Sequence, residues 1–171
     1  VARQVGSASS GGVDGFITSY QGYDRNGTAW QVLMDVANER PDFSFSAYIE
    51  TAVANSGHTD SEPTDPAYMR QWITEVVQRY GAAPSYLKMN GKPVIFIYRA
   101  RNLSPSVWKN EVFDPLRSQG IDAFYVADYV ASDNVAPVSE YLAVFDGMHS
   151  FNPSVYASLG DSYLQSVLTS N

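Results

Sequence analysis

Short apolar segments rich in aromatic and β-branched residues recur along this 171-residue chain, and their recurrence restricts the fold more than any other feature. A helix-like pattern, rather than a two-residue hairpin turn, follows each of them. Strands that alternate with helices predict parallel βαβ units. We therefore predict one α/β domain over residues 1–171 with a parallel sheet. The five predicted strands are Phe16–Tyr20, Phe43–Glu50, Val94–Arg99, Ala123–Tyr129 and Phe145–Phe151.

Helix signals fill the segments between these strands. One helix is predicted from Asp65 as N-cap, through Pro66 at the first helical position, to a stop at Gly81. Ser104 caps another helix, which we expect Pro115 to break before a short turn. Further helices are predicted over Ala29–Arg40 and Ser154–Leu168, and the first dozen residues resemble the end of a helix and a loop.

Three aspartates stand at the N-terminal ends of predicted strands. Asp14 and Asp122 occupy the same position in two similar segments, Gly12–Phe16 and Gly120–Phe124, and Asp146 lies at the start of the last strand. In α/β folds chemistry gathers at the opposite, carboxyl ends of the strands. We therefore predict that these aspartates form turns.

Composition limits the partners. A net charge of −7 argues against nucleic acid, because phosphate neutralisation needs a basic surface. No segment approaches the ~20 apolar residues of a membrane span, so we expect no membrane partner. Cysteine is absent, and His58 with Asp60 and Glu62 lacks the spacing of a metal site, so we expect no metal or cofactor. The compartment is left open, with an extracellular or periplasmic one favoured.

Two carboxylates at strand ends are candidate catalytic groups. Alternation along the second strand predicts that Ser44, Ser46, Tyr48 and Glu50 line one face, with Glu50 uppermost at the carboxyl end. Asp128 ends the fourth strand among aromatic neighbours that would raise its pKa toward general-acid use. The simpler alternatives are that Glu50 pairs with Arg99 or is solvated, and that Asp128 caps a strand end.

Other polar and aromatic residues at strand ends are candidates for sugar binding, because aromatic rings stack on sugar faces. For the tyrosines, packing in the core is an equally open alternative. For the histidine, the alternative is a structural role. Acidic residues of the long loop after Glu50, among them Asp60, Glu62 and Asp65, are further candidates for an acid, or are a helix cap and solvated charges. The predicted substrate-binding residues are Tyr20, Tyr48, Tyr98, Arg99, Tyr129, His149 and Asn152.

Several segments, in this order, resemble the glycoside hydrolase family 99-like barrels, which include endo-α-mannosidases. They are GVDGFITSYQG at 12–22, FSFSAYIE at 43–50, YLKMNGKPV at 86–94 and FDGM at 145–148. The resemblance implies a (β/α)₈ barrel that acts on a carbohydrate. It also implies that Glu50 matches a catalytic glutamate, which acts as a base on the sugar 2-hydroxyl.

The chain departs from the family pattern in two ways. Such a barrel has eight units in ~250 residues, whereas this chain supplies about five, which look like strands two to six. We therefore expect a partial TIM-type barrel with two open strand edges, and self-association or a partner chain that completes it. A second family glutamate, three residues after the first, is Val53 here.

Three functions follow as alternatives. The first is a glycoside hydrolase of the endo-α-mannosidase-like type that acts on an α-linked oligo- or polysaccharide. The second, supported by Val53, is a non-catalytic glycan-binding or polysaccharide-assembly module. The third is a flavodoxin-like open parallel sheet, for which five βα units are usual, although the segment Gln21–Gly27 lacks the composition of a phosphate-binding loop.

Overall fold

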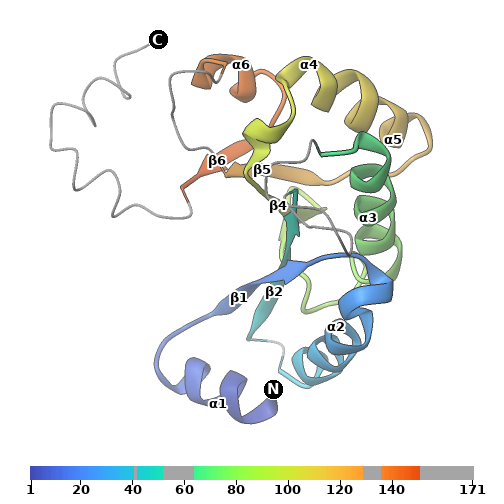
Figure 1. Cartoon of the computed structure of the whole chain (residues 1–171). Helices are drawn as coiled ribbons and strands as arrows, with labels where there is room; N and C mark the ends of the chain where they lie inside the picture. Colours follow the sequence, from blue (N-terminus) through green and yellow to red (C-terminus); the bar gives the residue numbers. More distant parts are fainter. Residues whose placement is uncertain (41, 52–63, 129–135, 151–171) are drawn as a thin grey trace, which may run out of the picture.

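The computed structural model describes residues 1–40, 42–51, 64–128 and 136–150. It shows an α/β fold with a parallel sheet whose strands form an arc, with helices along its outer side (Figure 1). A short strand, β3 (Lys88–Met89), pairs antiparallel with β4. The parallel strands, in their order across the sheet, are β1 (Gly15–Tyr20), β2 (Ser44–Glu50), β4 (Lys92–Tyr98), β5 (Phe124–Asp128) and β6 (Gly147–His149).

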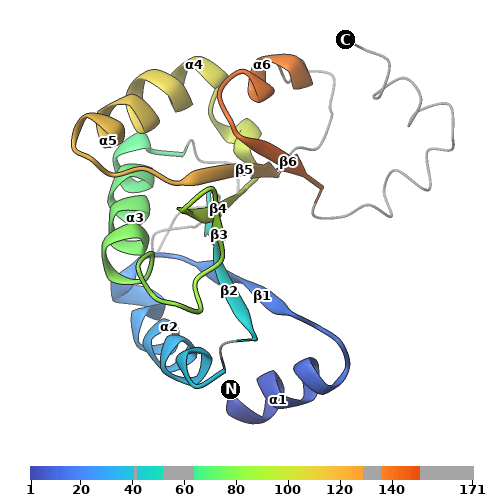
Figure 2. The ribbon, with the colours of Figure 1, turned by 180° about the vertical axis from the view of Figure 1, so that it is seen from behind.

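The order of the parallel strands follows their order in the chain. A flavodoxin-like sheet would reverse direction at a topological switch point, so that alternative is wrong, and the prediction of a parallel, barrel-like sheet is confirmed. Among the described residues, β1 and β6 each have a strand partner on one side only. Both outer strands can be followed from behind in Figure 2.

Two of the predicted helix caps are present in the structure. The Asp65 side chain accepts a hydrogen bond from the Ala67 N–H at 2.8 Å, with Pro66 at the first helical position. Ser104 accepts one from the Val107 N–H at 3.3 Å. No helix within the described ranges is long and apolar enough to cross a bilayer. The helices are α1 (Ala2–Ser10), α2 (Tyr23–Asn38), α3 (Pro66–Arg79), α4 (Pro105–Val107), α5 (Asp114–Ser118) and α6 (Val138–Leu142), with 3₁₀ turn η1 (Ala100–Asn102) and π-helical turn η2 (Trp108–Phe113).

Pro115 does not break the helix as predicted. The chain passes from α4 through the wider π-helical turn η2 directly into α5, with Pro115 in the first turn of α5. A proline lacks an N–H, so the carbonyl four residues earlier, that of Glu111, loses its usual helical partner. The Arg70 guanidinium of α3 donates a hydrogen bond to this carbonyl instead. A tertiary contact therefore offsets what the local sequence loses.

The aspartates lie at the amino ends of strands, as predicted, but only Asp146 lies in a bend, whereas Asp14 and Asp122 are in irregular segments rather than turns. Asp122 accepts a hydrogen bond from the Ala123 N–H at 3.0 Å and pairs with Lys92 at 2.6 Å. Asp146 accepts one from the Tyr125 N–H at 2.9 Å. The Asp14 carbonyl accepts a hydrogen bond from the Ser44 N–H at 2.8 Å. All three lie at the starts of strands, away from the carboxyl ends.

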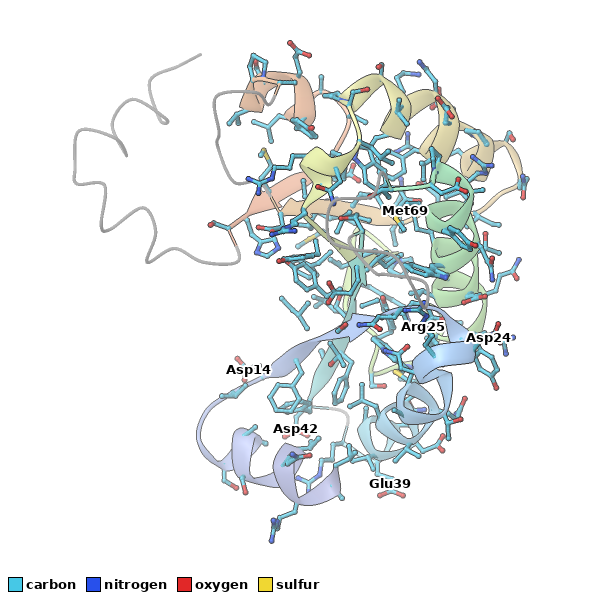
Figure 3. All side chains as sticks on the ribbon, in the orientation of Figure 1. Asp14, Asp24, Arg25, Glu39, Asp42 and Met69 are labelled. Carbon is cyan, nitrogen blue, oxygen red and sulfur yellow. The ribbon has the colours of Figure 1, made fainter. Side chains whose placement is uncertain are left out.

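Aromatic rings fill the layer between the sheet and the helices. Phe113 of η2 stacks on Tyr125 of β5 with ring centroids 4.0 Å apart, and it also contacts Trp108 and Phe145. All four side chains are buried. Several acidic side chains, by contrast, lie on the outside, as Asp14, Asp24, Glu39 and Asp42 show in Figure 3.

Candidate functional site

The sheet has two faces with different chemistry. Phe45, Ala47 and Ile49 of β2 are fully buried in the helix-covered core. The intervening residues face the concave side: the Ser46 hydroxyl bonds to the Val94 carbonyl at 2.7 Å, and the Tyr48 ring contacts other strands. This is the alternation that the sequence predicts. It places Glu50 at the carboxyl end of the concave face.

Glu50 is half-buried and is held by a residue of the neighbouring strand. The Ser19 hydroxyl donates a hydrogen bond to Glu50 Oε1 at 2.8 Å. Burial raises the pKa of the Glu50 carboxyl above its usual range, and the bond from Ser19 opposes part of that rise. Among the described residues Glu50 forms no ion pair with Arg99. A neutral hydroxyl therefore positions the carboxylate. Such surroundings are compatible with a role of Glu50 as a base.

Asp128 lies at the carboxyl end of β5 and is 1% exposed. Its Oδ2 accepts a hydrogen bond from the Arg99 N–H at 3.3 Å, so it does support the loop after β4, as the strand-end alternative predicts. It also faces the Tyr48 hydroxyl, whose pKa is raised chiefly by burial and then by Asp128. One strand, β4, separates Asp128 from Glu50.

Tyr48, Phe96, Tyr98 and His149 form an aromatic wall at this end of the concave face. The Tyr48 ring centroid lies 5.6 Å from that of Tyr98 and 5.5 Å from that of His149. Phe96 adds a further ring, 5.2 Å from His149. The predicted binding residues Tyr48, Tyr98 and His149 are thus brought together from β2, β4 and β6. Tyr48 is 7% exposed, whereas Tyr98 and His149 are half-buried, so these two rings are the ones that a ligand can reach.

Arg99 follows this wall in an unusual backbone conformation. Its φ of 45° and ψ of 51° are left-handed, which is uncommon for a residue with a side chain. Its guanidinium lies over the Tyr98 ring, 5.5 Å from the centroid. The Asn102 N–H donates to the Arg99 carbonyl at 2.9 Å, and Trp108 Nε1 donates to the next carbonyl, that of Ala100, at 2.7 Å. Two hydrogen bonds to its carbonyls therefore hold the strained turn.

Tyr20 is not part of this surface, which corrects the sequence prediction. It is fully buried on the helix side, where its hydroxyl donates to Glu75 Oε2 at 2.7 Å and its ring packs against Trp30. Position 20 shares a face with Phe16, which packs on Phe43, so the strand alternation already contained this signal. The other two predicted binding residues, Tyr129 and Asn152, lie outside the described residues, as do Val53, Asp60 and Glu62.

Two site residues were missed by the sequence prediction. Ser19 is one. Alternation along β1 puts Ser19 on the same face as Ile17, two positions earlier, and this was the available signal. Thr51 is the other: its hydroxyl donates to the Tyr98 carbonyl at 2.6 Å and accepts from Asn102 Nδ2 at 3.1 Å. This contact ties the carboxyl ends of β2 and β4 together. No pattern in the sequence indicates it, because both partners, the Tyr98 carbonyl and the Asn102 amide, lie far from Thr51 along the chain.

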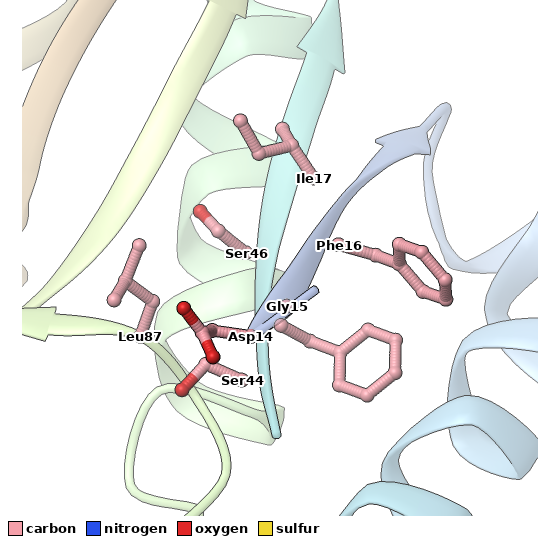
Figure 4. A pocket seen from close by; sticks show the side chains of 8 residues that line it. Asp14, Gly15, Phe16, Ile17, Ser44, Ser46 and Leu87 are labelled. Atoms are coloured by element: carbon pink, nitrogen blue, oxygen red, sulfur yellow. The ribbon is translucent and has the colours of Figure 1, made fainter. Parts of the chain in front are cut away.

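A pocket of about 260 Å³ lies at the other end of the same face (Figure 4). It is lined by Asp14, by the starts of β1 and β2, and by Leu87. Chemistry in parallel α/β folds gathers at the carboxyl ends of the strands. The pocket is therefore a less favourable site than the Glu50 end.

These features define an α/β protein whose parallel sheet corresponds to part of a (β/α) barrel. Among solved structures the chain is similar to the GH99 endo-α-mannosidase from Bacteroides thetaiotaomicron. One structure of that enzyme superposes with a TM-score of 0.70 and 18% identity, covering 96% of this chain and 49% of the other. Its complex with BIS-TRIS-propane gives a TM-score of 0.69 and 17% identity, with 96% and 52% covered.

The predicted likeness to a family 99-type barrel is thus confirmed at the level of the fold. The chain spans about half the length of these enzymes. No family model and no curated protein matches the sequence.

We expect His149 to make the protein sensitive to mild acid. Burial lowers the pKa of its imidazole below the ordinary 6.5, although Asp128 opposes this. The unfolded chain therefore binds the proton more readily, so the stability contributed by the neutral ring is complete above about pH 6.5 and is lost as the pH falls. Lowering the pH from 7.5 to 5.5 should lower the melting temperature more in the wild type than in His149→Phe. Equal decreases in the two proteins would contradict this prediction.

Proposed function

We propose that this chain carries the carboxylate centre of a glycan-processing site of the endo-α-mannosidase-like type, which acts on an α-linked oligo- or polysaccharide. The observation that carries the proposal is the position of Glu50: half-buried, bonded to Ser19 and next to an aromatic wall at the carboxyl ends of parallel strands. Glycosidic cleavage uses two carboxyl groups that flank the bond. Glu50 and Asp128 are the candidates at this edge.

Each residue then has a role that its surroundings support. Glu50 accepts the proton of a sugar hydroxyl, and its raised pKa brings it closer to the pH at which a base works best. Asp128 is the candidate acid for the leaving oxygen. With strands ~4.8 Å apart, the intervening β4 leaves a sugar-sized gap between the two strands. Tyr98 and Arg99, which are half-buried, contact the sugar ring and its hydroxyls.

A second candidate is a non-catalytic glycan-binding module on the same wall. Val53, where the family pattern has a second glutamate, favours it. The binding surface is the same in both candidates, so they differ only in whether a bond is cleaved.

Incubation with an α-mannan and its oligosaccharides tests both candidates. We expect new reducing ends to form in proportion to protein concentration, and the NMR signals of His149 and Tyr98 to shift as the oligosaccharide is added. A β-linked glucan of equal length is the control, and it should give neither new reducing ends nor shifted NMR signals. Shifted signals without new reducing ends would favour the binding module. Unshifted signals with no reducing ends would overturn the glycan proposal.

A further inference from the structure

Ser19 makes contacts on two sides, through its hydroxyl and through its carbonyl. The hydroxyl donates to Glu50 Oε1 at 2.8 Å, across the β1–β2 pair, in which Ser19 lies beside Tyr48. This bond occupies one oxygen of the carboxylate. Among the described residues no hydrogen bond to the second oxygen is found, so that oxygen can meet a ligand. The orientation of that second oxygen therefore depends on where Ser19 is fixed.

Helix α2 fixes Ser19 from behind. Asn26 Nδ2 donates to the Ser19 carbonyl at 3.0 Å, and Trp30 Nε1 donates to the same oxygen at 2.9 Å. Asn26 Oδ1 in turn accepts from the Gln21 N–H at 3.3 Å. Trp30 is buried in the core at 1% exposure. The end of β1 is thus anchored to a helix by two side chains.

The backbone pattern shows why this anchor is needed. The Ser44 N–H donates to the Asp14 carbonyl, so the even-numbered residues of β1 turn their backbone groups toward β2. In a parallel ladder the alternate residues, Ser19 among them, turn theirs outward. Within the described residues β1 has no strand on that outer side. Without the two donors the carbonyl of Ser19 would have no partner to hold it in place.

We infer that Ser19 is a positioning residue for Glu50, and that Asn26 and Trp30 hold Ser19 in the place where it can act. As a statement about catalysis this inference rests on the proposed function. A hydroxyl donor favours the ionised form of the carboxyl to which it is bonded. It thereby counteracts the burial of Glu50 and keeps a base available. It also prevents the carboxylate from rotating.

The titration of Glu50 tests the inference without any glycan. With ¹³C-labelled glutamate, the Glu50 carboxyl signal is identified by its loss in Glu50→Gln, and its midpoint is compared among variants. We expect a higher midpoint in Ser19→Ala and a near-normal one in Ser19→Thr, which restores the hydroxyl. Asn26→Ala should give an intermediate midpoint. Thr18→Val is the matched control, because it removes a hydroxyl from the same strand on the opposite face, and it should leave the midpoint unchanged.

Turnover provides the second measurement. On α-mannan, Ser19→Ala should lower kcat/KM about tenfold, the size of one hydrogen bond to a charged group. The acidic limb of the pH profile should move to higher pH. Ser19→Thr should recover most of the rate. An unchanged Glu50 midpoint in Ser19→Ala would overturn the inference. A raised midpoint in a chain that cleaves no glycan would uphold the positioning of Glu50 and refute the proposed function instead.

Discussion

Replacing Glu50 by glutamine is expected to lower kcat on an α-mannan by about 10²-fold or more, the scale of a lost acid–base group. The side chain keeps its shape and can still accept the Ser19 hydrogen bond, but it can no longer take a proton. KM should change little, because the aromatic wall that contacts the sugar stays in place. Initial rates over a range of substrate concentrations separate the two quantities.

The stability of this variant serves as its internal check. The pKa of Glu50 is higher in the folded chain than in the unfolded one, because burial disfavours the charge. The ionised carboxylate therefore lowers stability once the pH rises through its unfolded pKa. At pH 7, Glu50→Gln should melt at the same or a higher temperature. Glu39→Gln, an exposed carboxylate, should alter neither rate nor melting. Unaltered turnover in Glu50→Gln would remove Glu50 from the site, and a large drop in melting temperature would make it structural.

Truncating Phe113 to alanine should destabilise the protein by about 3–5 kcal/mol, the usual loss for a buried phenylalanine. Its ring is fully buried and stacks on Tyr125, with the centroids 4.0 Å apart and the planes inclined by 16°. It also contacts Trp108 and Phe145. The substitution leaves a cavity that these rigid rings cannot collapse to fill. Urea unfolding measures the difference in the free energy of unfolding.

Val32→Ala on α2 is the control for this truncation, because that side chain is 46% exposed. Surface substitutions usually change stability by less than about 0.5 kcal/mol. A loss below about 1 kcal/mol for Phe113→Ala would mean that the helix layer over β5 is packed more loosely than the ring contacts indicate.

The features that could be predicted from the sequence are those with a local cause. Alternation along Ser44–Glu50 placed Glu50 on the concave face because neighbouring side chains of a strand must point in opposite directions. The caps at Asp65 and Ser104 followed from the side-chain oxygens that bond to free N–H groups at helix starts. The parallel order followed from strands that are each succeeded by a helix.

Features with a tertiary cause were missed. Helix α2 begins at Tyr23, not at the predicted Ala29, since the Tyr23 N–H is capped by Glu75 of α3 at 2.9 Å and Arg79 covers its ring. The polar segment between those positions has no apolar periodicity that would predict a helix. Pro115 was expected to end a helix, and the contact from Arg70 to the Glu111 carbonyl is part of the reason why it does not. Such contacts join residues that are far apart in the chain.

The anchored carbonyl of Ser19 limits what can be added to the open edge of the sheet. A further strand beside β1 finds outward backbone groups at Gly15 and Ile17, but at Ser19 the oxygen already accepts from Asn26 and Trp30. Such a strand would therefore pair with the beginning of β1 and part from it before the level of Glu50.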